Sequence, residues 1–98
     1  MILHSFDKTF EHRIRLQIMG VLVLHDLYDF VELKSLLGIT DGNLASHMKV
    51  LEKEAYVEVL KSFAGKKPLT QYRATDIGKK AFLHHLDVLE SFIHQQKQ

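Results

Sequence analysis

Residues 36–57 read LLGITDGNLASHMKVLEKEAYV, which contains the end of one helix, a short turn and a second helix. Gly38 stands where a left-handed C-terminal cap is expected. Thr40 is a good N-cap, because its hydroxyl can accept a hydrogen bond from a free amide of the next helix. Apolar residues then recur at helical spacing and form the expected buried face of that helix: Leu44, Met48, Leu51 and Ala55. The stretch predicts two helices joined by a tight turn.

The residues before this stretch predict further elements. Residues 31–37 form the first helix of the pair, so that residues 31–55 make a helix-turn-helix, and residues 28–30 have the composition of a very short strand. Residues 7–25 carry apolar side chains at helical spacing on two sides, which predicts a first helix buried on two sides. Gly20 within it favours a close helix crossing, since glycine otherwise costs about 1 kcal/mol inside a helix.

The residues after the stretch predict a hairpin and a last helix. Residues 56–74 are β-prone and are interrupted at 64–68 by a turn that contains the chain's one proline. Residues 75–95 begin with an N-cap threonine and carry a broad apolar face: Ala81, Phe82, His85, Leu86, Leu89, Phe92 and Ile93. The expected order is α-β-α-α-β-β-α in one domain over residues 1–98. The predicted fold class is therefore α+β, mainly helical, a winged helix-turn-helix.

The net charge of +1 is unevenly distributed along the chain. Residues 1–41 hold four Lys or Arg against six Asp or Glu, residues 42–80 hold eight against four, and residues 81–98 hold one against two. The basic excess therefore lies in the middle of the chain. Such an asymmetry indicates a region that faces a polyanion.

The outward side of the second helix of the pair carries side chains suited to DNA. Small and hydrogen-bonding residues precede lysines on it: Gly42, Asn43, Ser46, Lys49, Val50 and Lys53, with His47 on the flank. Asn43 suits adenine, because its amide can pair with N6 and N7 together. Ser46 and His47 are secondary base readers, whereas Lys49 and Lys53 are expected on phosphates. The alternative is an ordinary solvated helix, but the adjoining helix and hairpin favour DNA.

The predicted hairpin adds positive charge to this region. Lys66 and Lys67 lie at its tip, and Arg73 lies on the returning strand. A projecting basic hairpin can reach a phosphate or the narrow minor groove beside a helix in the major groove. The alternative is a solvated turn whose charge only keeps it soluble. Arg73 has a further alternative, an ion pair with Glu58 across the hairpin.

Three segments together resemble one known family: residues 36–57, residues 63–75 with Gly78 following, and residues 12–19. They are similar to the helix-turn-helix, the wing and the first helix of winged-helix DNA-binding domains, small regulators related to the arsenic-repressor and multiple-antibiotic-resistance types. The resemblance implies a sequence-specific transcriptional regulator that binds double-stranded DNA as a homodimer. One departure is Ala55, where relatives usually have a glycine. Because alanine resists positive φ, the helix is expected to end differently there.

The predicted DNA contacts combine the residue-level reasoning with this resemblance: Thr40, Asn43, Ser46, His47, Lys49, Lys53, Lys66, Lys67 and Arg73. Dimerisation is expected through the first and last helices, because their apolar faces exceed what one small core can cover. Two copies of the second helix of the pair would then read half-sites about 34 Å apart. Occupancy of a promoter in this way most often produces repression.

Composition and motifs argue against several other classes. The chain has no cysteine, which excludes disulfides, thiolate metal sites and thiol redox chemistry. It also has no basic signal-peptide start and no uncharged stretch near the roughly 20 residues that span a bilayer, so the cytoplasm is the expected compartment and no membrane partner is expected. No nucleophile motif and no phosphate-cradling glycine loop are present, so neither catalysis nor a cofactor is expected.

Two alternative functions remain open at this point. One is a winged helix used for protein–protein contact without DNA. The other is a metal- or ligand-responsive sensor of the arsenic-repressor type, for which the last helix offers His84 with Asp87 and Glu90 with His94 at suitable spacing. Zinc needs four ligands, so a site would have to be completed across a dimer, and no metal residue is predicted. His85 points into the apolar face and is expected to be packed.

Overall fold

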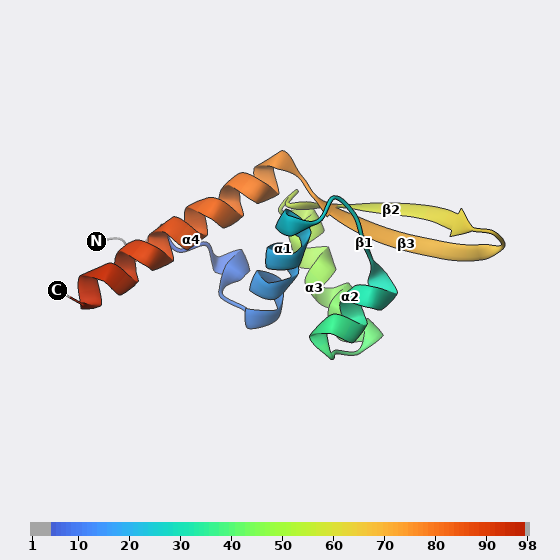
Figure 1. Ribbon diagram of the computed structural model, residues 1–98, viewed down its shortest axis with the longest axis horizontal. Helices are drawn as coiled ribbons and strands as arrows, with labels where there is room; N and C mark the ends of the chain where they lie inside the picture. Colours follow the sequence, from blue (N-terminus) through green and yellow to red (C-terminus); the bar gives the residue numbers. More distant parts are fainter. Residues whose placement is uncertain (1–4, 98) are drawn as a thin grey trace.

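The computed structural model describes residues 5–97 (Figure 1). Its elements follow the predicted winged-helix order: η2 (Lys8–Phe10, a 3-10 turn), α1 (Arg13–Leu24), β1 (Tyr28–Asp29), α2 (Phe30–Leu37), α3 (Asp41–Lys53), β2 (Val57–Ala64), β3 (Lys67–Ala74) and α4 (Asp76–Gln96). Four helices and a three-stranded antiparallel sheet in this part of the chain confirm the predicted fold class. Across residues 5–97, none of the helices has the length and apolar content that a membrane crossing requires.

The N-terminal segment differs from the predicted single helix over residues 7–25. Asp7 caps the 3-10 turn by accepting a hydrogen bond from Thr9 N at 2.9 Å. His12 caps α1 by accepting one from Ile14 N at 3.1 Å. Both cap residues have extended backbone, with ψ of 117° and 123°, so the chain leaves helical geometry at each of them. α1 therefore begins at Arg13, and the prediction is wrong for the residues before it.

The helix-turn-helix follows the prediction closely. Gly38 ends α2 with φ of +65°, and its amide donates to the carbonyl oxygens of Lys34 and Ser35. Thr40 Oγ1 accepts a hydrogen bond from Asn43 N at 3.1 Å and caps α3. Residue 30, expected at the end of the short strand, begins α2 instead.

The end of α3 corrects a sequence-based expectation. Ala55 adopts φ of +62°, the conformation that glycine usually supplies. Its amide donates to Glu52 O at 2.9 Å, and the amide of Tyr56 donates to Leu51 O at 2.9 Å. These are the two hydrogen bonds of a Schellman motif. The helix therefore ends as it would with glycine, and Ala55, which is exposed, does not belong to the buried face of α3.

The hairpin β2–β3, called the wing below, has strands that reach closer to its tip, and a shorter turn, than predicted. The sheet order is β1-β3-β2, and β2 pairs with β3 from Val57 opposite Ala74 to Ala64 opposite Lys67. Only Gly65 and Lys66 connect the strands. Gly65 has φ of +67° and Lys66 does not have a positive φ, the pattern of a type II′ turn. The expected turn over 64–68 is therefore too long, because its last two residues belong to β3.

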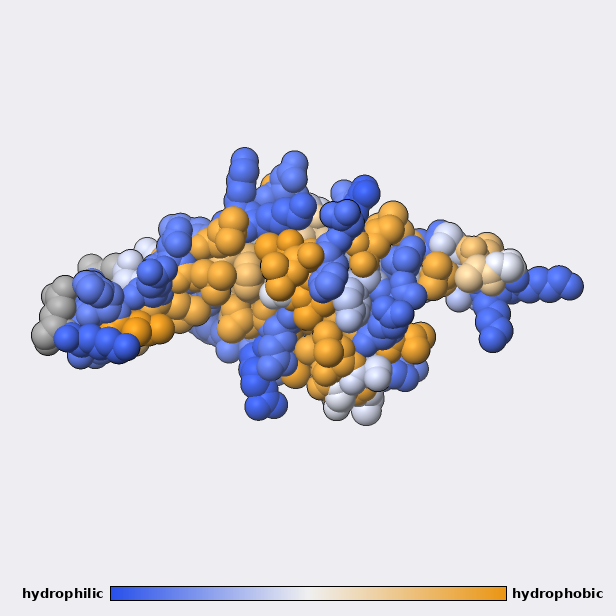
Figure 2. All heavy atoms as spheres, in the orientation of Figure 1, coloured by the Kyte–Doolittle hydropathy of each residue, from blue (hydrophilic) through white to orange (hydrophobic). Residues whose placement is uncertain are grey.

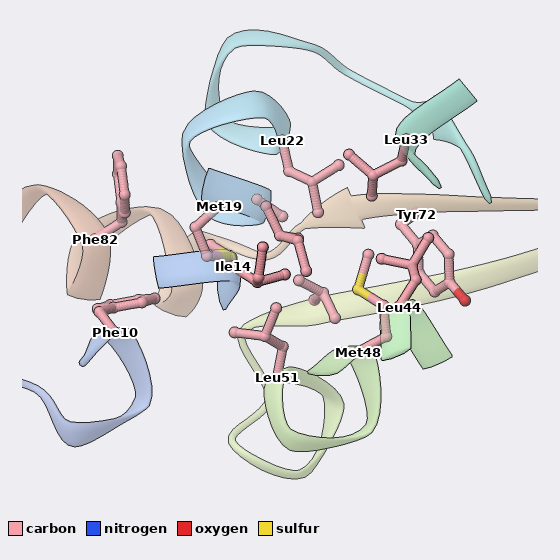
Figure 3. Packing of buried hydrophobic residues seen from close by; sticks show 13 residues of the cluster. Phe10, Ile14, Met19, Leu22, Leu33, Leu44, Met48, Leu51, Tyr72 and Phe82 are labelled. Carbon is pink, nitrogen blue, oxygen red and sulfur yellow. The ribbon is translucent and has the colours of Figure 1, made fainter. Parts of the chain in front are cut away.

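The core forms where α1 lies between α3, the sheet and the start of α4 (Figure 3). Its fully buried side chains come from three helices: Ile18, Met19, Leu22, Leu33, Leu44, Met48 and Leu51. The predicted close crossing at Gly20 is wrong, since a Cβ there would lie 3.7 Å from the Phe82 ring, an ordinary contact. The tight approach is at Gly78, whose Cβ would lie 2.1 Å from the carbonyl oxygen of Tyr56.

The chain before α1 is held against α4. The ring of Phe6 lies 5.8 Å from those of His85 and Phe92, and Asp7 N donates to His85 Nδ1 at 3.2 Å. Tyr56 Oη donates to Asp7 Oδ2 at 2.6 Å, and burial, with that hydrogen bond, raises the pKa of Tyr56, so the phenol stays protonated. His85 is buried, as expected for a packed histidine.

The outer half of α4 extends away from the body of the molecule (Figure 1). Its buried residues include Val88, which the predicted apolar face omits. Three large apolar side chains of this helix are more than a third exposed after Ile77: Leu83, Leu86 and Ile93. Two of them, Leu86 and Ile93, were expected on the apolar face. A single chain therefore covers only part of that face.

Candidate nucleic-acid interface

One side of α3 is buried and the other is open to solvent. Leu44, Met48 and Leu51 are at most 1% exposed and pack against α1 and the sheet. Every residue predicted to point outward is exposed: Gly42, Asn43, Ser46, Lys49, Val50 and Lys53. The structure therefore confirms the predicted orientation of this helix.

The first turn of α3 holds polar groups at the helix N-terminus. Thr40 caps the helix as an acceptor, which leaves its hydroxyl proton available to another acceptor. Lys34 Nζ lies 2.9 Å from Asp41 Oδ1. The side chain of Asn43 is exposed one turn further along. A helix that enters the major groove reads base edges mainly with its N-terminal residues, which is where these groups lie.

His47 faces α1 more than solvent. Its Nδ1 lies 3.3 Å from a terminal nitrogen of Arg15, and its ring centroid lies 4.3 Å from that of His12. Partial burial lowers the pKa of His47, and the His12 ring and the Arg15 guanidinium lower it further. The ring is therefore neutral at pH 7. This residue joins the flank of α3 to the start of α1, a tertiary role that the sequence did not reveal.

The lysines of α3 and of the wing tip are exposed and form no ion pair with any residue in the range 5–97. Within residues 5–97, the ion pairs shorter than 4.0 Å are Lys34 with Asp41 and Arg73 with Glu58. Four predicted phosphate contacts are therefore free of carboxylate partners in the described chain: Lys49, Lys53, Lys66 and Lys67. Their charges remain available to an external anion.

Arg73 differs from these lysines. It lies directly opposite Glu58 in the β2–β3 register, and its Nε is 2.8 Å from Glu58 Oε2. Both side chains are about half exposed, at 52% each. The ion pair that was weighed against a DNA contact therefore forms in the free protein, at the base of the wing near α4.

The wing carries one basic residue that sequence reasoning missed. Lys61 is exposed in the middle of β2, opposite Thr70. The signal for it was present in the sequence, because residues 59–72 contain three lysines and no Asp or Glu. The prediction missed it because it considered only the lysines of the turn and the arginine of the returning strand.

The wing projects from the body on the side opposite to the outer half of α4 (Figure 1). The molecule measures 57 Å along this direction but only 26 Å and 21 Å across it. Long hydrophilic side chains extend from the far end of the wing in the space-filling view (Figure 2). The arrangement combines an open helix face with an extended basic arm.

No group of three or more His, Asp or Glu side chains within residues 5–97 is arranged to hold a metal ion. A shallow hollow of about 460 Å³ on the outer half of α4 is lined by Asp87, Glu90, Ser91 and His94. These residues include one of the spaced pairs considered for a sensor site. In the described chain they do not form a complete ligand set.

Comparison with known proteins agrees with this geometry. Residues 14–93 match the family described as the winged helix DNA-binding domain. The chain belongs to this family. The match covers all four helices and the wing of this winged-helix protein, from the first turn of α1 almost to the end of α4. The resemblance noted in the sequence is thus confirmed.

Three relatives of the winged-helix protein illustrate the similarity. An uncharacterized protein of Methanocaldococcus jannaschii is 34% identical over 79 residues, which cover 81% of this chain and 86% of the relative. A transcriptional regulator homologue from Pyrococcus horikoshii has a structure with a TM-score of 0.81 at 29% identity, covering 93% of this chain and 95% of that one. The transcriptional repressor BigR from Xylella fastidiosa has a TM-score of 0.65 at 28% identity, covering 93% and 83%.

Proposed function

We propose that this winged-helix protein is a sequence-specific transcriptional regulator that binds double-stranded DNA as a homodimer. The observation that carries the proposal is the exposed outer side of α3, whose lysines have no carboxylate partner in the part of the chain that the structure describes. Next to it lies an arm with three lysines and no acid over residues 59–72. Duplex DNA is a polyanion large enough to contact the lysines of both surfaces at the same time.

Each predicted contact has a defined part in this proposal. Asn43 and Ser46 read base edges in the major groove, because they are short, polar and exposed near the start of α3. The Thr40 hydroxyl donates to a phosphate while it caps the helix. Lysines supply the remaining phosphate contacts, which position the helix without reading sequence: Lys49, Lys53, Lys66 and Lys67.

His47 and Arg73 have weaker support as DNA contacts. His47 is half-buried against Arg15 and His12, so its role is to hold the recognition helix α3 against α1. Arg73 is occupied by Glu58, and a surface ion pair of this kind contributes at most about 1 kcal/mol. A nearby phosphate can therefore compete for the guanidinium, which makes Arg73 a secondary contact.

The homodimer is supported by the uncovered apolar side chains of α4, especially Leu86 and Ile93. α1 contributes less than the sequence indicated, because the second of its two predicted apolar sides, formed by Leu16, Met19 and Val23, is already covered within one chain. Met19 is buried, and Leu16 and Val23 are half-buried. A twofold dimer places two α3 helices in successive major grooves, about 34 Å apart. Occupancy of a promoter by such a dimer excludes polymerase, and we infer repression as its usual outcome. BigR, a relative at 28% identity, is a repressor.

The test is a fluorescence anisotropy titration with duplex DNA from the region upstream of the protein's own gene. The double variant Lys66→Ala/Lys67→Ala is expected to weaken binding and to flatten the plot of log affinity against log salt by about 0.9 per lost phosphate contact. The double variant Lys8→Ala/Lys97→Ala removes the same charge far from α3 and the wing tip and is expected to bind as the wild type. Undetectable binding by the wild type even at low salt, where phosphate contacts are strongest, would instead favour a protein–protein module.

A further inference from the structure

The outer half of the wing carries an apolar pair that the core does not use. Phe63 and Pro68 lie directly opposite each other, one residue pair before the pair that adjoins the turn. Opposed residues share one face of a hairpin. On that face, Val57 and Tyr72 are buried near the body, whereas Phe63 is 71% exposed and Pro68 is also exposed. This face of the wing is therefore buried against the core near the body of the molecule and exposed to solvent near the tip.

Positive charge surrounds this apolar pair. Lys61 lies two residues before Phe63 on the same strand, so the two side chains share a face. Lys66 is in the turn, and Lys67 adjoins Pro68. No acidic residue occurs between Val59 and Tyr72 to neutralise these lysines. The complementary partner is a polyanion that presents an apolar surface between its charges.

The DNA minor groove has that character. Phosphates line its two edges, and sugar C–H groups and base edges form its walls and floor. The groove of B-DNA is about 6 Å wide, so it admits side chains from a hairpin tip but not a two-stranded ribbon. Phenylalanine and proline are among the apolar residues that proteins insert into it.

We propose that Phe63, supported by Pro68, inserts into the minor groove beside the site read by α3, while Lys61 and Lys66 bind the flanking phosphates. This inference rests on the proposed DNA-binding function and names the residue that anchors the wing. The ring contact is apolar, so it supplies a share of the affinity that does not depend on salt. It also makes binding sensitive to groove width, and hence to A·T content at positions that α3 does not contact.

The salt dependence of binding separates the ring from the lysines. With a labelled duplex selected from a random pool by the wild type, Phe63→Ser is expected to weaken binding about tenfold at every salt concentration, without changing the slope. Lys66→Ala/Lys67→Ala changes the slope as well. Leu24→Ser is the matched control, since Leu24 is an even more exposed apolar residue, at 81%, and lies at the end of α1.

A fluorescent probe locates the ring directly. The chain contains no tryptophan, so Phe63→Trp supplies a unique signal. Its emission is expected to shift to shorter wavelength and to become protected from acrylamide when the selected duplex is added. A minor-groove-binding polyamide, added as competitor, is expected to reverse both effects. Circular dichroism of each variant checks that the wing and helices are intact.

The outcomes distinguish this inference from the proposed function. If Phe63→Ser binds the duplex as tightly as the wild type while the lysine double variant binds weakly, the protein is a DNA-binding regulator but the ring contact is refuted. If the wild type selects no duplex at all, the proposed function fails as well. A tryptophan shift with anionic phosphatidylglycerol vesicles and none with duplex would assign the wing tip to a membrane surface and overturn the inference.

Discussion

Gly78 is the position where this fold tolerates no side chain. A Cβ there would lie 2.1 Å from the carbonyl oxygen of Tyr56 and 2.8 Å from its carbonyl carbon. These are backbone atoms at the start of the wing, and they cannot move without disturbing β2. Gly78→Ala is therefore expected to lower the free energy of unfolding by about 3 kcal/mol or more, measured by urea denaturation.

Gly20 is the matched comparison for that prediction. It also lies in a helix, α1, but its Cβ would make only an ordinary 3.7 Å contact with the side chain of Phe82 on α4. Gly20→Ala is expected to leave stability unchanged or to raise it by up to about 1 kcal/mol, because alanine is the better helix former. Equal destabilisation by both alanines would show that space at Gly78 is not the cause.

Ala55 stores a small strain at the end of the recognition helix. A non-glycine residue in the left-handed region costs on the order of 1 kcal/mol, and Ala55 has φ of +62°. Ala55→Gly is expected to raise the free energy of unfolding by about that amount in urea denaturation. Ala45→Gly, in the interior of the same helix, is the control and is expected to lower it by a similar amount. A loss of stability from both glycines would contradict this account.

The contact between the N-terminal segment and α4 depends on a neutral histidine. Asp7 N donates to His85 Nδ1, which must therefore be unprotonated. Burial lowers the pKa of His85 from its ordinary value of 6.5, although the nearby Asp7 and Glu11 carboxylates oppose this shift and His84 adds to it. The unfolded chain thus takes up a proton at a higher pH than the folded one does.

The sign of the pH dependence follows from that difference. The contribution of neutral His85 to the free energy of unfolding is fully present above pH 6.5. It is lost as the pH falls below 6.5 toward the lower folded-state pKa of this residue. His47 acts in the same direction, because its pKa is also lowered. Urea denaturation at about pH 7.5 and about pH 5.5 is expected to show lower stability at the acidic value. His85→Phe is expected to reduce this difference, whereas His84→Gln, at an exposed position, removes only the smallest cause of the His85 shift and is expected to leave most of the difference in place. An undiminished difference in His85→Phe would refute the assignment.

The recognition helix α3 and the outer wing are held in place by different interactions. α3 is held by a local cap at one end, a Schellman motif at the other and three buried side chains between them. The outer wing has no such packing, and every residue from Lys61 to Pro68 is exposed. Its order comes from the strand register and the two-residue turn. The position of α3 therefore depends on the core, whereas the outer wing depends only on its own strand pairing.

The whole molecule leaves apolar surface uncovered on α4, which the dimer proposal assigns to a second copy. Leu86→Glu/Ile93→Glu is expected to convert a dimer of about twice the 11.4 kDa chain mass into a monomer, measured by analytical ultracentrifugation. The monomer would bind one half-site and lose cooperative affinity for a two-site duplex. Val31→Glu, at an exposed position on α2 and outside both helices of the proposed interface, is the control. A wild type that sediments as a monomer at micromolar concentration would refute the interface.

Much of the fold and of the candidate site could be predicted because their causes are local. Gly38, Thr40 and Thr75 end or begin helices through hydrogen bonds that reach no more than four residues. The buried side of α3 follows from helical periodicity alone, and its opposite side is therefore exposed. The lysines of α3 are exposed for the same reason, whereas those of the wing tip are exposed because they lie in or beside a hairpin turn. Their exposure could therefore be predicted from the sequence.

Other features depend on residues that lie far apart in the chain. His47 faces Arg15, Arg73 pairs with Glu58, and Asp7 contacts His85 across 78 positions of sequence. The same is true of Gly78, where a side chain is excluded because the backbone of Tyr56 lies against this position. Periodicity and capping say which side of an element is buried, because they act within one turn or strand. Only the packing of one element on another decides which polar groups meet there, and hence which of them remain free for a partner.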